Sequence, residues 1–266
     1  MAAITETIKE RKSVRSYTGE PLSTELKQDI INYINQLVLP FGTKARIKLI
    51  STSIDNQPLK LGTYGVISGA KDFLLLLSEK GLMQEVGAGY MFEQVVLHCT
   101  QLGLGTCWLG GTVKRTDFLA QIKAENNEEL IVISPVGYKR EKKTLVDSIF
   151  RAGAGSDKRK PFGALFFKDN FATPLTEAAA GNYETPLQML RLAPSASNKQ
   201  PWRVVLQNNI FHFYCSAGHF STNDVGIALC HFELTCQELG LKGNFETRTN
   251  TPSQKGIEYV ISWIPQ

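Results

Sequence analysis

Two arginines and a serine near the N-terminus form the first group of side chains that could bind a ligand. They lie in the segment Arg11-Lys12-Ser13-Val14-Arg15, directly after a polar, helix-like stretch. Two guanidinium groups four residues apart, with a hydroxyl between them, could surround a phosphate with charge-assisted hydrogen bonds. Basic residues also gather at helix C-termini, where the helix dipole favours them, so this segment alone leaves a purely structural role open.

A second segment, LGLGTCWLGG from Leu102 to Gly111, contains four glycines and follows a long apolar helix. Glycine lets the backbone approach a flat ligand closely, and the N–H groups of Gly110 and Gly111 could then point at a ring nitrogen. A helix C-cap followed by a turn would account for Gly103, but it leaves the later pair unexplained.

A third segment, APSASNKQPW from Ala193 to Trp202, is a polar loop of small residues between an expected helix and an expected strand. A proline near each end stiffens the loop, and Ser195, Ser197 and Asn198 offer hydrogen bonds. A surface turn would also be polar, but it would not require so many donors in a stiffened loop.

Apolar periodicity indicates which elements position these segments. Helices and strands alternate along the chain, which favours an α+β fold with helices packed on a mixed sheet. We expect helices at 26–37 (capped by Ser23), 83–102, 117–124 (capped by Thr116), 185–191 and 223–239, and strands at 45–52, 72–78, 129–136, 202–207, 210–216 and 258–264, with a hairpin turn at Asn208-Asn209.

The two longest helices match one another without a gap. GAGYMFEQVVLHCTQLGLG begins at Gly87 and DVGIALCHFELTCQELGLK begins at Asp224, an offset of 224 − 87 = 137 residues. Any two amphipathic helices that end in glycine look alike, but the segments QLVLPFGTKARIKLI and LRLAPSASNKQPWRVVL form a second pair, which aligns roughly, with a gap of about one residue. The pattern therefore favours an internal duplication, with a first half at 1–160 and a second at 161–266.

Together the three segments resemble the nitroreductase superfamily of FMN enzymes. RKSVRSY is similar to its N-terminal phosphate motif, and APSASNKQPW to its flavin-contacting loop. The long helix leading into LGLGTCWLGG, and the strand ending at Tyr138, are similar to its central region. Arg159 stands where the family has a late phosphate-binding arginine. The resemblance is closest to the fused, two-repeat branch. It implies a nitroreductase-like three-layer α+β fold, in which two half-repeats form an internal pseudo-dimer.

One departure from the family pattern is large. In ordinary members the flavin loop follows the phosphate motif within a few tens of residues, whereas here 193 − 15 = 178 residues separate them. At the early position stands VLPFGTKARIKL, without the serines, the asparagine and the tryptophan. The second half has KDNFATPLTEAAAG where RKSVR would stand. Each half has thus kept one part of the binding set, which implies one FMN per chain, bound by both halves, and a monomer.

The resemblance also implies roles for individual residues. No catalytic side chain and no metal ligand are expected, because the flavin performs the redox chemistry and the protein binds and orients it. The cofactor-binding residues would be Arg11, Lys12, Ser13, Arg15 and Arg159 at the phosphate, Leu109, Gly110 and Gly111 through backbone N–H groups at flavin N5 and O4, Pro194, Ser195, Ala196, Ser197 and Asn198 along the ring, and Tyr64 on the pyrimidine side.

The implied activity is NAD(P)H-driven reduction of nitroaromatic compounds, quinones or similar acceptors. Hydride would pass from NADH or NADPH through flavin N5 in a ping-pong cycle. Two alternatives remain open at this point: an FMN-binding protein without efficient turnover, for sensing or cofactor holding, and a flavin-free structural relic. The intact phosphate and loop motifs argue against the relic.

Composition and charge argue against several other classes of protein. The net charge is +4 without a basic stripe, which disfavours nucleic acid as a partner. No apolar stretch suggests a signal peptide or a membrane span. The five cysteines are odd in number and form no CxxC, so reduced thiols in a cytoplasmic protein are expected. His98 and His231 each adjoin a cysteine, but neighbouring helix positions point about 100° apart and cannot chelate one metal.

Overall fold

The computed structural model describes residues 2–54, 57–58, 63, 65–111, 113–122, 127–140, 158–218 and 220–266. The chain folds into two compact units. The first unit comprises Glu10–Ser156, and the second comprises Ala2–Lys9 together with Asp157–Gln266. In the second unit the backbone N–H groups of Ile4 and Thr5 donate to the Glu238 carboxylate, which ties the start of the chain to a distant helix.

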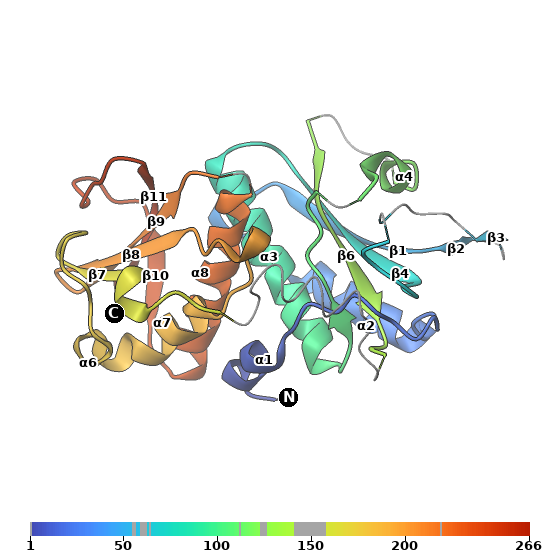
Figure 1. Cartoon of the computed structure of the whole chain (residues 1–266), viewed down its shortest axis with the longest axis horizontal. Coiled ribbons are helices and arrows are strands. Elements are labelled where there is room, and N and C mark those ends of the chain that lie inside the picture. Colours follow the sequence, from blue (N-terminus) through green and yellow to red (C-terminus); the bar gives the residue numbers. More distant parts are fainter. Residues whose placement is uncertain are drawn as a thin grey trace. The chain divides into compact units, whose positions relative to one another are not determined.

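The first unit is built around a four-stranded antiparallel sheet, in the order β1-β4-β6-β5. Figure 1 shows its long helix α3 and its shorter helices. The element bounds are α1 Ile4–Glu10 (shared with the second unit), α2 Thr24–Gln36, η1 Pro40–Gly42, β1 Ala45–Ser51, β2 Ser53–Ile54, β3 Gln57–Pro58, β4 Asp72–Ser78, α3 Leu82–Gln101, β5 Gly105–Thr106, α4 Arg115–Leu119 and β6 Glu129–Gly137.

The second unit is built around a five-stranded sheet, in the order β10-β11-β9-β8-β7. Only the edge strand β7 is parallel to its neighbour. The element bounds are η2 Phe162–Ala164, β7 Phe166–Lys168, α6 Glu177–Ala180, η3 Gly181–Tyr183, α7 Glu184–Arg191, η4 Ala196–Asn198, β8 Trp202–Gln207, β9 Ile210–Ser216, α8 Ser221–Glu238, β10 Gly243–Glu246 and β11 Ile257–Pro265.

The two units repeat one topology. The sheet order β1-β4-β6-β5 of the first unit corresponds to the order β8-β9-β11-β10 of the second. The long helix α3 follows β4, and the long helix α8 follows the equivalent strand β9. A 3₁₀ turn precedes the first strand in both, and its middle residue is left-handed in both: Phe41 at φ 57° and Ser197 at φ 51°. The expected duplication and the α+β fold are therefore confirmed.

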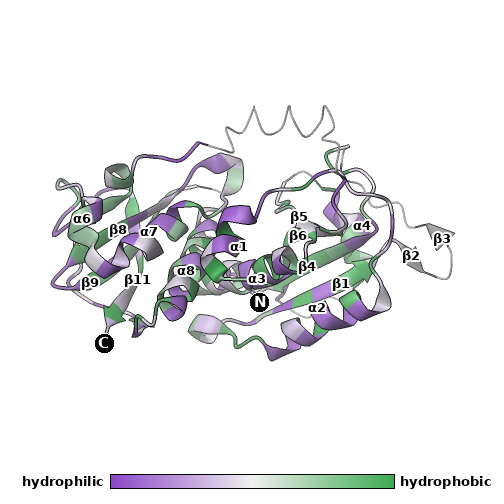
Figure 2. Ribbon diagram, turned by 90° about the horizontal axis from the view of Figure 1, so that it is seen from below, coloured by the Kyte–Doolittle hydropathy of each residue, from purple (hydrophilic) through white to green (hydrophobic). Residues whose placement is uncertain are grey.

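The apolar pattern explains the core of the first unit. Every residue of β4 is buried. Leu74 and Leu76 pack into one hydrophobic cluster, and Phe73, Leu75 and Leu77 pack into another. A continuous apolar strand is what a sheet covered on both faces requires. Figure 2 shows the outer helix α2 largely in hydrophilic colours, in keeping with its single buried residue, Ile30.

Most expected elements are present within two residues of their expected bounds, and one cap is wrong. Ser23 accepts the N–H of Leu26 at 3.3 Å, as expected for the N-cap of α2. Thr116, by contrast, lies inside α4, which begins at Arg115 and has Lys114 at its N-cap. Arg115 fixes the start of this short helix because its guanidinium donates to the carbonyls of Leu130, Gly110 and Ile131.

The sequence also predicted that no segment spans a membrane and that the cysteines are reduced. No helix within the described residues is long and apolar enough to cross a membrane. The five cysteines are buried and none of them is in a disulfide. Burial raises the pKa of Cys99 to about 12, so this thiol stays protonated and unreactive near neutral pH.

Candidate functional site

The phosphate-type motif of the first unit is an extended segment that hydrogen bonds tie to its neighbours. Val14 N–H donates to Thr106 O at 2.8 Å, and Ser68 N–H donates to Arg15 O at 2.9 Å. A Cβ on Gly105 would come within 2.8 Å of the Val14 side chain, so glycine is needed there for the close approach. The structure therefore brings Ser13, Val14 and Arg15 next to the start of the glycine-rich segment.

A buried carboxylate joins the same two segments. Glu93, on α3, is fully buried. Its carboxylate accepts the Trp108 Nε1–H at 2.8 Å and lies 3.8 Å from Arg11 Nε, too far for a hydrogen bond. The charge of Arg11 is thus balanced inside the unit while its Nε–H remains without an acceptor among the described residues. The sequence reading missed Glu93, because α3 also carries Glu85 and only the fold shows which of the two acids lies buried beside Arg11 and Trp108.

The glycine-rich segment offers fewer backbone donors than expected. Leu109 N–H is already donated to Ile133 O at 2.9 Å, and Leu109 O accepts in return at 3.1 Å. The role expected for the Leu109 N–H at the flavin is therefore excluded by its use in the sheet. The Gly110 carbonyl accepts from Arg115 at 2.8 Å, which fixes that peptide. A Cβ on Gly111 would meet no atom within 4 Å, so open space adjoins this residue.

Lys12 and Tyr64 were also expected to bind the cofactor. Lys12 is exposed, between Arg11 and Ser13. Tyr64 lies outside the described residues.

The flavin-type loop lies in the second unit and has an unusual backbone. Ser197, Asn198 and Gln200 all have positive φ, at 51°, 53° and 50°. Left-handed backbone costs a residue with a side chain about 1–2 kcal/mol, and such strain persists only where surrounding contacts enforce it. Within the loop, Ser195 O accepts the Asn198 N–H at 2.9 Å and Ser195 Oγ accepts the Gln200 N–H at 2.9 Å.

Asp224, in the first turn of α8, holds the same loop from outside. Its carboxylate oxygens lie 3.2 and 3.0 Å from the Ala196 nitrogen, which donates to them. Burial raises the pKa of Asp224 to about 7, although the Ala196 hydrogen bond and the charge of Lys199 oppose the rise. The sequence reading used Asp224 only to align the repeat and did not recognise this contact.

Arg159 belongs to the second unit and contacts the loop directly. Its Nη1 lies 3.3 Å from Asn198 Oδ1, and its Nη2 donates to Leu192 O at 3.1 Å. Lys160 Nζ donates to Lys199 O at 2.7 Å and Arg203 Nη1 donates to Gln200 O at 3.0 Å. Burial lowers the pKa of Lys160 and of Arg203, and the charge of Arg203 adds to the effect on Lys160. Cationic side chains therefore border the loop, an arrangement that suits an anionic ligand.

The structure thus brings the expected residues together in two groups, one in each unit. The first unit holds Arg11, Ser13, Arg15 and the Gly110-Gly111 pair. The second holds Arg159 and the loop from Pro194 to Asn198.

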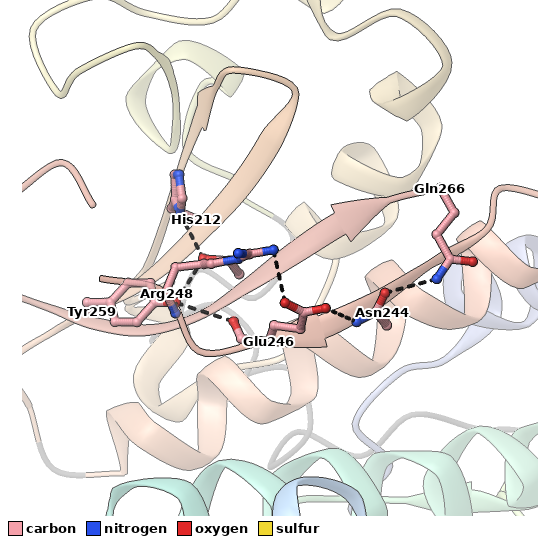
Figure 3. A network of polar contacts seen from close by, with 7 residues as sticks. His212, Asn244, Glu246, Arg248, Tyr259 and Gln266 are labelled. Atoms are coloured by element: carbon pink, nitrogen blue, oxygen red, sulfur yellow. Dashed lines mark hydrogen bonds and ion pairs between the residues drawn. The ribbon is translucent and has the colours of Figure 1, made fainter. Parts of the chain in front are cut away.

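A different polar network could suggest hydrolytic chemistry. Figure 3 shows His212, whose Nδ1 lies 2.7 Å from Ser262 Oγ, and Tyr259, whose hydroxyl lies 2.8 Å from the same oxygen. A serine beside a histidine resembles a nucleophile and its base. Ser262 is fully buried, however, and Tyr259 occupies the other side of its hydroxyl. This network stabilises β9 and β11 and presents no nucleophile to a substrate.

The histidines on the long helices have structural partners. His231 is fully buried, and its Nδ1 lies 3.0 Å from Met189 O. His98 lies 2.6 Å from Asp29 and stacks on Tyr33. Among the described residues, no group of three His, Cys, Asp or Glu side chains could hold a metal ion.

Comparisons with known proteins identify the family of the chain and agree with its fold. Residues 3–236 match the family described as "Putative TM nitroreductase". The crystal structure of a "putative nitroreductase" from Thermotoga maritima aligns over 99% of this chain and 94% of that one, with 23% identity and a TM-score of 0.64. A nitroreductase family protein from Clostridium novyi aligns over 56% of this chain and 91% of its own, at 16% identity and a TM-score of 0.42. A nitroreductase with bound FMN from Bacteroides fragilis covers 55% of this chain and 92% of its own, at 20% identity and a TM-score of 0.42. No curated protein sequence matches the chain.

Proposed function

Because the chain belongs to the "Putative TM nitroreductase" family, we propose that it is an FMN-dependent oxidoreductase driven by NADH or NADPH. Its acceptors would be nitroaromatic compounds, quinones or similar small molecules. The observation that carries the proposal is the strained loop at Pro194–Asn198, which the cationic Arg159 contacts, because loop strain of this kind is concentrated at ligand-binding sites.

The phosphate end of FMN fits the donors of the first unit. Arg11 and Arg15 bring two positive charges to one extended segment, and Ser13 adds a hydroxyl. The buried Nε–H of Arg11, without an acceptor among the described residues, is the kind of donor that a phosphate oxygen would satisfy. We assign these three residues, with Lys12 and with Arg159 of the second unit, to the phosphate.

We assign the ring end of FMN to the loop of the second unit and, separately, to the Gly110-Gly111 backbone of the first. Ser197 is exposed, and Pro194, Ser195, Ala196 and Asn198 are partly exposed, so they can border a flat ligand. The N–H groups of Gly110 and Gly111 are the donors we assign to N5 and O4, and the open space next to Gly111 supports this. Tyr64 stays assigned to the pyrimidine side from the sequence alone.

Bound FMN would accept hydride from the nicotinamide and deliver it to the acceptor. The residues of this chain would bind and orient the ring, and cationic groups beside the loop would favour its electron-rich states. No side chain is assigned a proton-transfer step.

An anaerobic absorption titration tests the proposal. Purified protein should be yellow or become yellow with added FMN, and NADH or NADPH should bleach it. A nitroarene or a quinone should then restore the colour. Yellow protein that neither nucleotide bleaches would establish the alternative, an FMN-binding protein without turnover. Protein that stays colourless with excess FMN would refute the cofactor assignment.

We also propose that the chain acts as a cytoplasmic monomer. Five buried cysteines outside any disulfide support a reducing compartment. The duplication supports the monomer, because one chain already contains the two repeats that separate subunits supply elsewhere in the superfamily. Sedimentation equilibrium showing a stable dimer would contradict it.

A further inference from the structure

We propose that Asp224 is a positioning residue, which holds the flavin loop in its left-handed conformation and thereby sets the affinity for FMN. The inference rests on the proposed function, because it assumes that the Pro194–Asn198 loop contacts FMN. Asp224 itself is not assigned a contact with the cofactor.

The contact between Asp224 and the loop joins a rigid helix to the start of the strained turn. Asp224 lies one turn into the 18-residue helix α8, a rigid element, and is 5% exposed. Both of its oxygens are directed at the N–H of Ala196, the residue that begins the 3₁₀ turn η4. The strained residues follow directly, at Ser197 and Asn198. An anchor at the start of this turn opposes the relaxation of φ to negative values.

The two repeats differ at the helix position of Asp224. Asp224 corresponds to Gly87 in the first unit, since 224 − 137 = 87. A Cβ on Gly87 would meet Thr43 Oγ1 at 1.7 Å, so a side chain has no space there. The turn beside Gly87 is the PFG turn at Pro40–Gly42, which lacks the serines and the asparagine of the flavin loop. A carboxylate therefore stands at this helix position only in the repeat that has kept the loop residues.

The charge state of Asp224 also affects its contact with the loop. Lys199, on the loop, is the charged side chain whose field acts on Asp224 among the described residues. Because burial brings the pKa of Asp224 to about 7, its ionised fraction changes near neutral pH. An ionised carboxylate accepts the Ala196 N–H more strongly than a protonated one. Loop order and FMN affinity should therefore rise as the pH increases through 7.

The test compares FMN dissociation constants of the wild type, Asp224→Asn and Asp224→Ala by fluorescence quenching from pH 5.5 to 8.5. At pH 8 we expect Asp224→Ala to weaken binding about 10-fold or more, as for loss of a hydrogen bond to a charged group. Asp224→Asn keeps an acceptor and should lose about 3-fold. The rise in affinity through pH 7 should disappear in both variants.

A buried carboxylate elsewhere provides the matched control. Asp72, in the first unit, is 1% exposed and accepts from Leu22 N and Ser51 Oγ. Asp72→Asn should lower thermal stability but leave the FMN dissociation constant and its pH dependence unchanged. Equal effects of Asp72→Asn and Asp224→Asn on FMN affinity would show that Asp224 acts only through global stability, and would overturn the proposal.

Hydrogen exchange separates this proposal from the proposed function. In the cofactor-free protein, the amides of Asn198 and Gln200 should exchange faster in Asp224→Ala than in the wild type. In Asp72→Asn they should exchange at the wild-type rate. Faster exchange supports the positioning role even if the wild type fails to bind FMN, a result that would refute the proposed function alone. Unchanged exchange, or unchanged FMN affinity in a wild type that binds FMN, would overturn the role of Asp224.

Discussion

Single buried carboxylates link the candidate binding segments to the long helices in both units. In the first unit Glu93 lies on α3 between Arg11 and Trp108, and in the second Asp224 lies on α8 beside Ala196. Neither could be assigned from the sequence, because each helix carries other acidic residues as well, and only the fold shows which of them has a buried partner. The arginine and loop residues were assigned because the family pattern itself names them.

At Glu93 we predict a large loss of stability from a small chemical change. Glu93→Gln keeps an acceptor for Trp108 but leaves the charge of Arg11, whose side chain is 8% exposed, without its counter-charge. Breaking a buried ion pair costs about 3–5 kcal/mol, and we expect a value near 3 kcal/mol in urea unfolding. Added FMN should recover part of this loss if its phosphate reaches Arg11.

A surface pair is the control for that prediction. Glu6 and Lys9 pair at 2.7 Å, but both side chains are more than half exposed. Glu6→Gln should leave the unfolding midpoint unchanged within error, because solvent screens such pairs. A Glu93→Gln variant as stable as Glu6→Gln would mean that Arg11 is not held by Glu93.

The raised pKa of Asp224 predicts a distinct pH dependence of stability. An aspartate in an unfolded chain has a pKa of about 3.9, whereas Asp224 in the folded chain has a pKa of about 7. Between these values the folded state binds more protons than the unfolded state. The contribution of Asp224 to stability must therefore fall as the pH rises from 4 to 7, by at most about 1.4 kcal/mol per pH unit.

The measurement is a difference between two proteins, because other carboxylates also titrate. The free energy of unfolding of the wild type minus that of Asp224→Asn should decrease from pH 4.5 to 7 and then level off. A difference that stays constant, or that increases with pH, would contradict the raised pKa. If the difference decreases as predicted, ionisation of Asp224 lowers the stability of the fold while it strengthens the anchor of the loop. Binding sites often show such a loss of stability in favour of function.

At the scale of elements, the sequence predicted what periodicity encodes and missed what tertiary contacts decide. β4, β8 and β9 have the expected bounds, because continuous or alternating apolar runs between turn residues specify strands locally. The short strands β5 and β10 were not expected, since two to four residues carry no period and become strands only through pairing with β6 and β11. Thr116 was expected to cap α4, but the helix begins one residue earlier, at Arg115, whose side chain forms tertiary hydrogen bonds.

Two left-handed turns allow a prediction at this scale. Asn208 and Asn209 connect β8 to β9 with φ of 51° and 61°, the backbone of a type I′ hairpin turn, and Ser197 has φ 51° in the flavin loop. Glycine relieves left-handed strain but costs entropy, so Asn209→Gly and Ser197→Gly should each stabilise the protein by about 0.5 kcal/mol.

Their effects on FMN should differ. Asn209→Gly should leave the FMN dissociation constant unchanged, whereas Ser197→Gly should raise it several-fold, because a looser loop must be ordered again on binding. Calorimetry of both variants, with and without FMN, measures the two quantities. A loss of stability in Ser197→Gly, or no change in its FMN affinity, would mean that the left-handed turn is not strained or does not serve binding.

At the scale of the molecule, both units have the same topology, but each contains only one of the two candidate binding motifs, RKSVR and APSASN. Both units keep the same strand order, the same long helix and the same left-handed turn before the first strand. Strand order rests on many interchangeable apolar residues, so it survives substitution. A cofactor motif rests on a few specific donors, and each repeat has lost one set: the first lacks the APSASN loop and the second lacks RKSVR.

This division predicts one FMN per chain, because each set of donors occurs once. Titration of the apoprotein should saturate at one equivalent, and Arg15→Ala and Asn198→Ala should each weaken that single binding step by about 10-fold or more. Arg46→Ala and Asn250→Ala, an arginine and a left-handed asparagine outside both sets, are the matched controls and should leave the step unchanged. Two equivalents of FMN, or an effect from only one of the two test variants, would mean that the phosphate motif and the loop do not serve the same flavin.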